Sequence, residues 1–243
     1  MDNQDLKEVR IWNIKYNLLT AQEIASVVNT WLKEGRRGIH LTGVDAHVTV
    51  LAQTDDLLRR AILDSDIVNV DSFLPAKMLS KKGYNIKDRV TTPDLMEELL
   101  KCANSNSQKV YLLGAKEDTV LLLKDKLLLD YPTMKIVGCH SGYFDDDEEQ
   151  VIINELSIVA PDYLFLGLPS PKKERFILKY KSKIDVGVFL GVGGAFDARA
   201  GVMRRPPGVL QRHGLEAVFR VSRNPKVYGN RIKSIIKFYK LAK

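Results

Sequence analysis

The sequence has little cysteine and no long apolar run. Only two of its 243 residues are cysteines, Cys102 and Cys139, which lie far apart and have no CxxC partner. Two such residues cannot form a metal site alone, and they are typical of free thiols in a reducing compartment. No apolar run approaches the roughly 18–20 residues that a membrane-spanning helix needs, and the first ten residues, MDNQDLKEVR, are too charged for a signal peptide. We therefore expect a cytoplasmic protein, which could still lie on the inner face of a membrane.

Motifs of several common enzyme classes are also missing. The four histidines show neither HExxH nor another zinc spacing, and no GxSxG nucleophile motif is present. The glycines of Gly191–Asp197 lack the third glycine of GxGxxG and follow the last expected strand, which excludes a Rossmann dehydrogenase. Asp64–Asp66 and Asp145–Asp147 resemble acidic pairs that hold divalent ions, but the first precedes a strand and the second is typical of a helix's first turn. We therefore expect no metal site.

The charge is divided unevenly along the chain. From Arg199 to Lys243 there are 12 lysines or arginines and one acidic residue, Glu216, whereas residues 1–198 carry a net charge of −4. A concentrated positive segment attracts polyanions or anionic surfaces, so nucleic acid, phosphate-bearing ligands and anionic membrane are all candidate partners. The basic segment has no recognised nucleic-acid-binding motif and few aromatic side chains for base stacking. For this reason we do not expect nucleic acid as the partner.

Short β-branched or apolar runs alternate with helix-length amphipathic stretches, which predicts an α/β fold with a largely parallel sheet flanked by helices. A capping box at Thr20–Glu23, an N-cap at Thr92 before Pro93 and an acidic turn from Asp145 indicate helix starts. The expected strands are Val9–Ile14, Gly38–Thr42, Ile67–Val70, Lys109–Leu113, Lys135–Val137, Asp162–Leu166 and Asp185–Leu190.

The composition changes near Asp197–Gly201, after the last expected strand. We therefore predict an α/β core over residues 1–197 and a basic C-terminal helical appendage over residues 198–243. An amphipathic segment over 225–241 would dock on a membrane or pack against the core. Its expected apolar face consists of Val227, Ile232, Ile235, Ile236 and Tyr239.

Ligands of an open α/β sheet bind at the carboxyl ends of its strands. Residues at the expected strand ends should therefore line one cleft, and they are Thr42, Asp71, Gly114, Gly167 and Gly191. Asp71 is the first candidate for a general base, because its carboxylate would face this cleft. The alternative is that Asp71 is the N-cap of a helix expected over 73–82.

Two loops could bind an anionic ligand. Residues 166–174 join a strand to a helix through glycine, two prolines and a serine, and bring backbone amides and two lysines to a helix N-terminus. Such a place suits a diphosphate, although an ordinary turn with solvated lysines explains the same pattern. The glycines of 191–197 permit close backbone approach to a ligand, and Asp197 is either a ligand contact or a cap.

Ordered motifs over nearly the whole chain are similar to those of one enzyme family. They are VDSFLPAKMLSKKG, VYLLGAKEDTV, IVGCHSGYF, LFLGLPSPKKERF, GVGGAFDARAG, RRPP and GLEAVFR. With these motifs the chain resembles the WecG/TagA/CpsF glycosyltransferases, glycosyltransferase family 26. The resemblance implies a Rossmann-like core and an appendage that completes the active site and touches the membrane. It also implies inverting, metal-independent and cofactor-free sugar transfer from a UDP donor to a polyprenyl-diphosphate-linked sugar in bacterial surface-polymer synthesis.

The resemblance also implies roles for individual residues. Asp71 matches the family's proposed general base, and Thr42 matches a threonine near the reacting sugar. Nucleotide-sugar binding is implied for Gly114, Gly167, Pro169, Ser170, Lys173, Glu174, Gly193, Gly194 and Asp197. Contact with diphosphate or lipid is implied for Arg204, Arg205, Arg220 and Arg231. The positive charge of these arginines would stabilise the departing diphosphate where no metal does so. Homo-oligomer formation is a further possibility.

Three departures from the family pattern affect sugar specificity and arginine roles more than the reaction class. Lys173 replaces the glutamine of PKQE, Thr42-Gly43-Val44 replaces TxN with Asp45 next, and Asn224–Val227 replaces EPxR. N-acetylmannosamine or its uronic acid is the expected sugar among hexoses and N-acetylhexosamines, with a UDP-glucose-type transferase as the alternative. A non-catalytic module that binds nucleic acid or anionic lipid is the alternative of another class.

Overall fold

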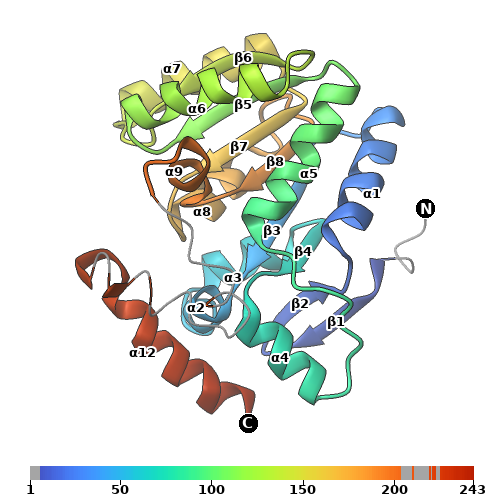
Figure 1. The fold of residues 1–243 in the computed structure, drawn as a ribbon, viewed down its shortest axis with the longest axis vertical. Helices are drawn as coiled ribbons and strands as arrows, with labels where there is room; N and C mark the ends of the chain where they lie inside the picture. The colour runs from blue at the N-terminus through green and yellow to red at the C-terminus, as the bar shows by residue number, and fades with distance from the viewer. Residues whose placement is uncertain (1–5, 204–209, 211–218, 220, 223–224) are drawn as a thin grey trace.

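A computed structural model of the chain describes residues 6–203, 210, 219, 221–222 and 225–243. Strands and helices alternate as the sequence predicts (Figure 1). The strands are β1 (Glu8–Ile11), β2 (Ile14–Asn17), β3 (Ile39–Val44), β4 (Ile67–Val70), β5 (Lys109–Gly114), β6 (Lys135–His140), β7 (Tyr163–Gly167) and β8 (Val188–Gly191). The helices are α1 (Ala21–Lys33), α2 (Ala46–Leu51), α3 (Asp56–Leu63), α4 (Phe73–Lys81), α5 (Thr92–Ser105), α6 (Glu117–Asp130), α7 (Asp146–Val159), α8 (Lys172–Tyr180), α9 (Ala195–Ala200) and α12 (Pro225–Ala242).

The eight strands form one sheet in the order β1-β2-β4-β3-β8-β7-β5-β6. All neighbouring strands are parallel except β1 and β2. Helices cover both faces of the sheet (Figure 1). Residues of α1, α5, α6 and α9 form one buried cluster with one face of the sheet, and α7 and α8 cover part of the other face. The prediction of a Rossmann-like α/β fold is confirmed.

The expected single strand over Val9–Ile14 is wrong, because the chain turns back within it. β1 and β2 form an antiparallel hairpin in which Ile11 pairs with Ile14. The two residues between them, Trp12 and Asn13, have φ values of 54° and 56°. Two-residue hairpin turns of this kind need positive φ at both central residues and usually contain glycine. A tryptophan in this position gives no recognisable turn signal.

Helix starts follow the expected capping chemistry with one shift. Thr20 and Glu23 form a complete capping box at α1, and Asp145 forms another with Glu148 at α7. The N-cap of α5 is Thr91 rather than Thr92, and its side chain accepts a hydrogen bond from the backbone N–H of Asp94. The difference matters because it leaves the Thr92 hydroxyl available for another partner.

The C-terminal helix α12 packs on the core, but not through the apolar face for which we considered either membrane docking or core packing. Phe238 is fully buried, and its ring centroid lies 4.9 Å from that of Trp12 at the hairpin turn. Ser234 and Ala242 are also buried, whereas Ile232 and Ile236 are 40% and 55% exposed. The interpretation that those two isoleucines pack against the core is therefore wrong. A serine and an alanine line the buried side, so apolar residues alone did not identify it.

Candidate active site

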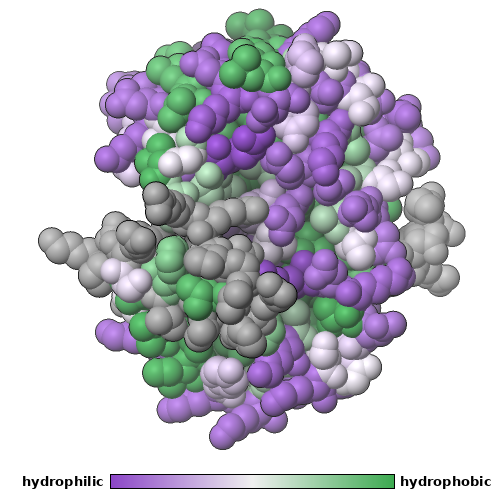
Figure 2. Space-filling view, in the orientation of Figure 1, coloured by the Kyte–Doolittle hydropathy of each residue, from purple (hydrophilic) through white to green (hydrophobic). Residues whose placement is uncertain are grey.

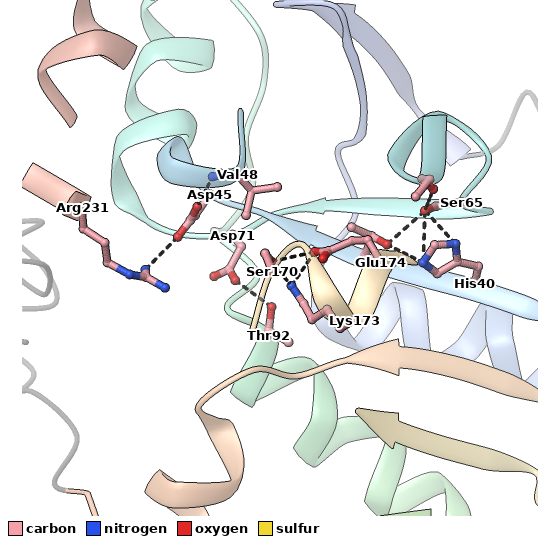
Figure 3. Close-up of polar contacts among 12 residues, drawn as sticks. His40, Asp45, Val48, Ser65, Asp71, Thr92, Ser170, Lys173, Glu174 and Arg231 are labelled. Atoms are coloured by element: carbon pink, nitrogen blue, oxygen red, sulfur yellow. Dashed lines mark hydrogen bonds and ion pairs between the residues drawn. The ribbon is translucent and has the colours of Figure 1, made fainter. Parts of the chain in front are cut away.

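Asp71 lies at the carboxyl end of β4 and is held there by a threonine from another element. Its Oδ2 accepts a hydrogen bond of 2.7 Å from Oγ1 of Thr92, the first residue of α5 (Figure 3). Both side chains lie over Gly43 of β3, where an added Cβ would collide with Thr92 Oγ1 and lie 3.2 Å from Asp71 Oδ2. The glycine therefore creates the space in which this carboxylate is positioned.

The backbone turns sharply directly after Asp71. Ser72 has φ 84° and ψ 161°, a conformation that is costly for any residue other than glycine, by about 1–3 kcal/mol. Ser72 is the N-cap of α4, so the alternative interpretation of Asp71 as that N-cap is wrong. Strain of this kind clusters at functional sites, and here it lies next to the carboxylate expected to act as base.

Asn69 of β4 helps to hold the backbone around the same site in place. Its Nδ2 donates a hydrogen bond of 2.7 Å to the backbone oxygen of Val90, and the Val90 N–H donates to Val70. These bonds align the segment before α5 with β4 and so place Thr92 beside Asp71. Asn69 is fully buried, and its Oδ1 has no hydrogen-bond partner within the described part of the chain.

A buried polar network supports the neighbouring strand β3 from the opposite face of the sheet. Thr42 Oγ1 lies 2.8 Å from His40 Nε2 and 3.0 Å from Ser65 Oγ. Burial, with nearby lysines, lowers the pKa of His40 to about 3, so the imidazole is neutral. Thr42 is 3% exposed. Its hydroxyl is therefore bonded within the protein to His40 and Ser65, and a contact between Thr42 and the reacting sugar stays a prediction.

The start of α8 contains a compact buried ion pair. Lys173 Nζ lies 2.6 Å from Glu174 Oε1, and Ser170 Oγ bridges the two at 2.6 Å and 2.7 Å. The aliphatic part of Lys173 crosses Gly191 of β8, where a Cβ would lie 2.6 Å from its Cδ. Glu174 is 1% exposed, and its Oε2 has no hydrogen-bond partner among the described residues. Lysine in place of the family's glutamine thus forms an internal salt bridge.

The glycines expected to bind nucleotide have structural reasons of their own. Gly114 and Gly167 are paired in register between β5 and β7, and a Cβ on Gly114 would collide with the backbone of Gly167. A Cβ on Gly167 would lie 2.5 Å from the ring of Phe196. Close packing of the strand ends therefore requires both glycines, and nucleotide contact stays a prediction for each.

The loop after β8 presents glycines at the surface of the same sheet edge. Gly193 has φ 53° and Gly194, the N-cap of α9, has open space where a Cβ would be. Asp197 lies in the first turn of α9, where burial raises the pKa of its carboxyl group. Pro169 belongs to the loop after β7, and its backbone oxygen accepts from the Lys173 N–H.

Helix α12 reaches this region from the C-terminal end of the chain. Arg231 Nη1 lies 3.0 Å from Oδ2 of Asp45, which follows β3 and caps α2 (Figure 3). Burial would raise the pKa of Asp45, but Arg231 and the Val48 N–H lower it, and the net shift is downward. His47 also bonds Ser234 of α12 at 2.8 Å. The other expected arginine contacts, Arg204, Arg205 and Arg220, lie outside the described residues.

The acidic pairs considered as metal sites have other partners. Asp66 pairs with Arg36 and accepts from the His40 N–H, and Asp145 caps α7. Within the described ranges, no three His, Cys, Asp or Glu side chains are grouped so that they could hold a metal ion.

Sequence reasoning found Asp71 but missed the other residues of the site around it. Asn69 and Gly43 showed no motif, and Thr92 was explained as a cap. Asp45 was noticed only as a departure from a family pattern. One signal was available for three of these four residues, since Asn69, Gly43 and Asp45 lie within two residues of the ends of neighbouring parallel strands.

The fold and site define a class of protein. Loops at the carboxyl edge of a Rossmann-like sheet surround a positioned carboxylate, and the surface is hollowed between the part containing α6 and α9 and the part containing α4 and α12 (Figure 2). Such an arrangement is typical of enzymes that bind nucleotide-linked substrates. The chain belongs to the WecG/TagA/CpsF glycosyl transferase family, whose family model matches residues 9–242. It is therefore a glycosyltransferase.

Curated relatives match over the whole chain. Proteins of Staphylococcus aureus strains MW2 and NCTC 8325 are each 27% identical over 244 residues, covering 100% of this chain and 95% of the relative. The protein of strain MRSA252 is 26% identical with the same coverage. All three are named N-acetylglucosaminyldiphosphoundecaprenol N-acetyl-beta-D-mannosaminyltransferase.

Proposed function

We propose that this enzyme transfers N-acetylmannosamine or a closely related sugar from a UDP donor to N-acetylglucosamine linked to a polyprenyl diphosphate. The names of the relatives support the sugar and the acceptor. The position of Asp71 at the edge of β4, fixed by Thr92 over Gly43, is the observation that supports the chemistry. In this proposal Asp71 removes the proton of the acceptor hydroxyl as its oxygen attacks the anomeric carbon. The bond from that carbon to UDP breaks, and the configuration inverts.

Positive charge must stabilise the departing UDP. We assign this role to the basic appendage, with Arg231 next to the site and Arg204, Arg205 and Arg220 following the core in sequence. Charge-assisted hydrogen bonds from arginine to phosphate oxygens are strong and are often bidentate. The loops at Gly167–Glu174 and Gly193–Asp197 are the proposed donor-binding elements, with Gly114 beside them. In this scheme transfer needs no metal.

Turnover with a panel of UDP-sugars tests this function directly. With a lipid-linked N-acetylglucosamine diphosphate as acceptor, UDP-N-acetylmannosamine should be the preferred donor, and an α-configured donor should give a β-linked product by NMR. EDTA should leave the rate unchanged, because protein cations replace a divalent ion in the proposed scheme. Loss of turnover with EDTA and its recovery with Mg²⁺ or Mn²⁺ would contradict metal independence. If only UDP-glucose gave a product, the proposed donor would be wrong.

We also propose that α12 binds the membrane surface on which the lipid-linked acceptor lies. Its outward side carries Ile232, Ile236 and Tyr239, each at least 40% exposed, together with the exposed lysines Lys233, Lys237 and Lys240. Hydrophobic surface is visible over α12 in Figure 2. Apolar side chains flanked by lysines are typical of helices that lie in a membrane interface. The described residues contain no helix long and apolar enough to cross a membrane.

Vesicle co-sedimentation tests this membrane contact. Changing Ile232→Ser and Ile236→Ser together should weaken binding to anionic vesicles by at least about tenfold, because each buried isoleucine contributes roughly 1.5–3 kcal/mol. The matched control changes Leu129→Ser and Ile158→Ser, which are 82% and 83% exposed on α6 and α7 at the other end of the molecule. Equal loss in both double variants, or no loss in the first, would contradict the assignment.

A further inference from the structure

A groove of about 650 Å³ runs along α4, immediately after the candidate base. One wall is the side of α4 that carries Phe73, Lys77 and Lys81, and the other wall is formed by Ile86, Asp88 and Arg89 in the segment that follows the helix. None of the proposed donor-binding residues lines it. The groove is therefore a second possible binding surface of the enzyme.

The groove combines two kinds of chemistry. Phe73 and Ile86 supply apolar surface, while the exposed Lys77 and Lys81 supply positive charge. Lys77 lies 5.4 Å from the centre of the Phe73 ring, so a cation and an apolar surface are adjacent. Lysine and arginine bind phosphate oxygens, and apolar surface binds hydrocarbon. A molecule with a diphosphate attached to a hydrocarbon chain matches both features.

Both walls of the groove are formed by segments whose chain continues into the site of Asp71. Phe73 begins α4 two residues after the carboxylate. On the other wall Arg89 precedes Val90, which is hydrogen-bonded to β4 through Val70 and Asn69. Thr92, the partner of Asp71, follows two residues later. A ligand lying in the groove would thus end beside the base.

The sheet order separates this groove from the proposed donor side. β4, which ends at Asp71, lies on one side of β3, whereas β8, β7 and β5 lie on the other side. The proposed donor-binding glycines either end β5 and β7 or follow β8. Two substrates placed in this way would bring the acceptor hydroxyl and the UDP group to opposite faces of the anomeric carbon, as an inverting displacement requires.

The groove also lies at the end of the molecule where α12 packs. Leu79 of α4 belongs to the same buried cluster as Phe238 and Ala242 of α12, and both helices lie at one end of the molecule in Figure 1. The exposed isoleucines of α12 are therefore at the same end as the groove. A lipid anchored in a membrane below α12 could enter the groove without crossing the protein.

We propose that this groove binds the diphosphate and the first prenyl units of the lipid-linked acceptor, a specific inference that rests on the proposed function. Lys77 and Lys81 would contact the diphosphate, and Phe73 and Ile86 would contact the hydrocarbon. The hydroxyl of the sugar attached to the diphosphate would then lie next to Asp71.

Direct binding tests this groove independently of turnover. The probe is a fluorescent farnesyl-diphosphate-linked N-acetylglucosamine, and UDP binding is measured in parallel on the full chain. Changing Lys77→Gln and Lys81→Gln together should raise the Kd for the probe at least tenfold and change the Kd for UDP less than twofold. Ala76→Trp, which fills the groove without changing charge, should have the same effect. Changing Lys33→Gln and Lys101→Gln, exposed lysines on α1 and α5, should change neither Kd.

The possible outcomes separate this inference from the proposed function. If the variants weaken probe binding while the wild-type enzyme transfers no sugar, the groove stands and the function is wrong. If the wild-type enzyme transfers N-acetylmannosamine but the lysine and tryptophan variants bind the probe normally, the groove assignment is wrong. Equal weakening of UDP and probe, or weakening of anionic-vesicle binding alone, would also overturn it. Failure of the wild-type chain to bind the probe would likewise show that the groove assignment is wrong.

Discussion

Asp71→Asn should lower the rate constant for sugar transfer by about 10²- to 10⁴-fold, the usual contribution of a general base. Asparagine has nearly the same shape, and its Oδ1 can still accept the hydrogen bond from Thr92. The substitution removes only the ability to take a proton, so the affinities for donor and acceptor should stay within about twofold of wild type. Steady-state kinetics with varied donor and acceptor measures both quantities.

Two further variants make the assignment specific. Asp64→Asn changes an exposed carboxylate at the end of α3 that pairs with Arg60, and it should leave the rate unchanged. Gly43→Ala adds a methyl group where Thr92 and Asp71 meet, so it should slow transfer at least tenfold without unfolding the protein. Full activity of the Asp71→Asn variant would show that Asp71 is not the general base, even if the Gly43→Ala variant transferred sugar slowly.

Local sequence signals predicted most of the fold. The capping box at Thr20, the acidic first turn from Asp145 and most of the apolar strand runs depend on neighbouring residues, and the structure confirms them. The hairpin was missed because the conformation of Trp12 and Asn13 depends on strand pairing rather than on their own preferences. A prediction based on residue preferences alone therefore extended one strand through the turn.

The site was only partly predictable because its residues meet through long-range contacts. Asp71 was found from its place at a strand end, but its partner Thr92 is 21 residues away in sequence. The buried face of α12 was missed for a related reason. Phe238 packs against Trp12 from the other end of the chain, and that contact leaves Ile236 outward. Amphipathic spacing identifies possible faces of a helix, but the partner decides which face is buried.

The internal salt bridge of α8 gives the site its largest expected stability effect. Lys173 and Glu174 have side chains that are 10% and 1% exposed, and Ser170 completes their hydrogen bonding. Removing one partner of a buried ion pair leaves an uncompensated charge and typically costs about 3–5 kcal/mol. Lys173→Met should therefore lower the free energy of unfolding by about that amount, as measured by urea denaturation.

The same helix supplies a matched control. Lys179 pairs with Glu149 at 2.5 Å, but the lysine side chain is 56% exposed, and exposed pairs contribute only about 0–1 kcal/mol. Lys179→Met should thus be nearly neutral for stability. Combining Lys173→Met with Glu174→Leu should recover much of the lost stability, because no buried charge then remains unpaired. If Lys173→Met and Lys179→Met had equal effects, burial of the pair would not be the cause, and Lys173 would instead be free to bind substrate.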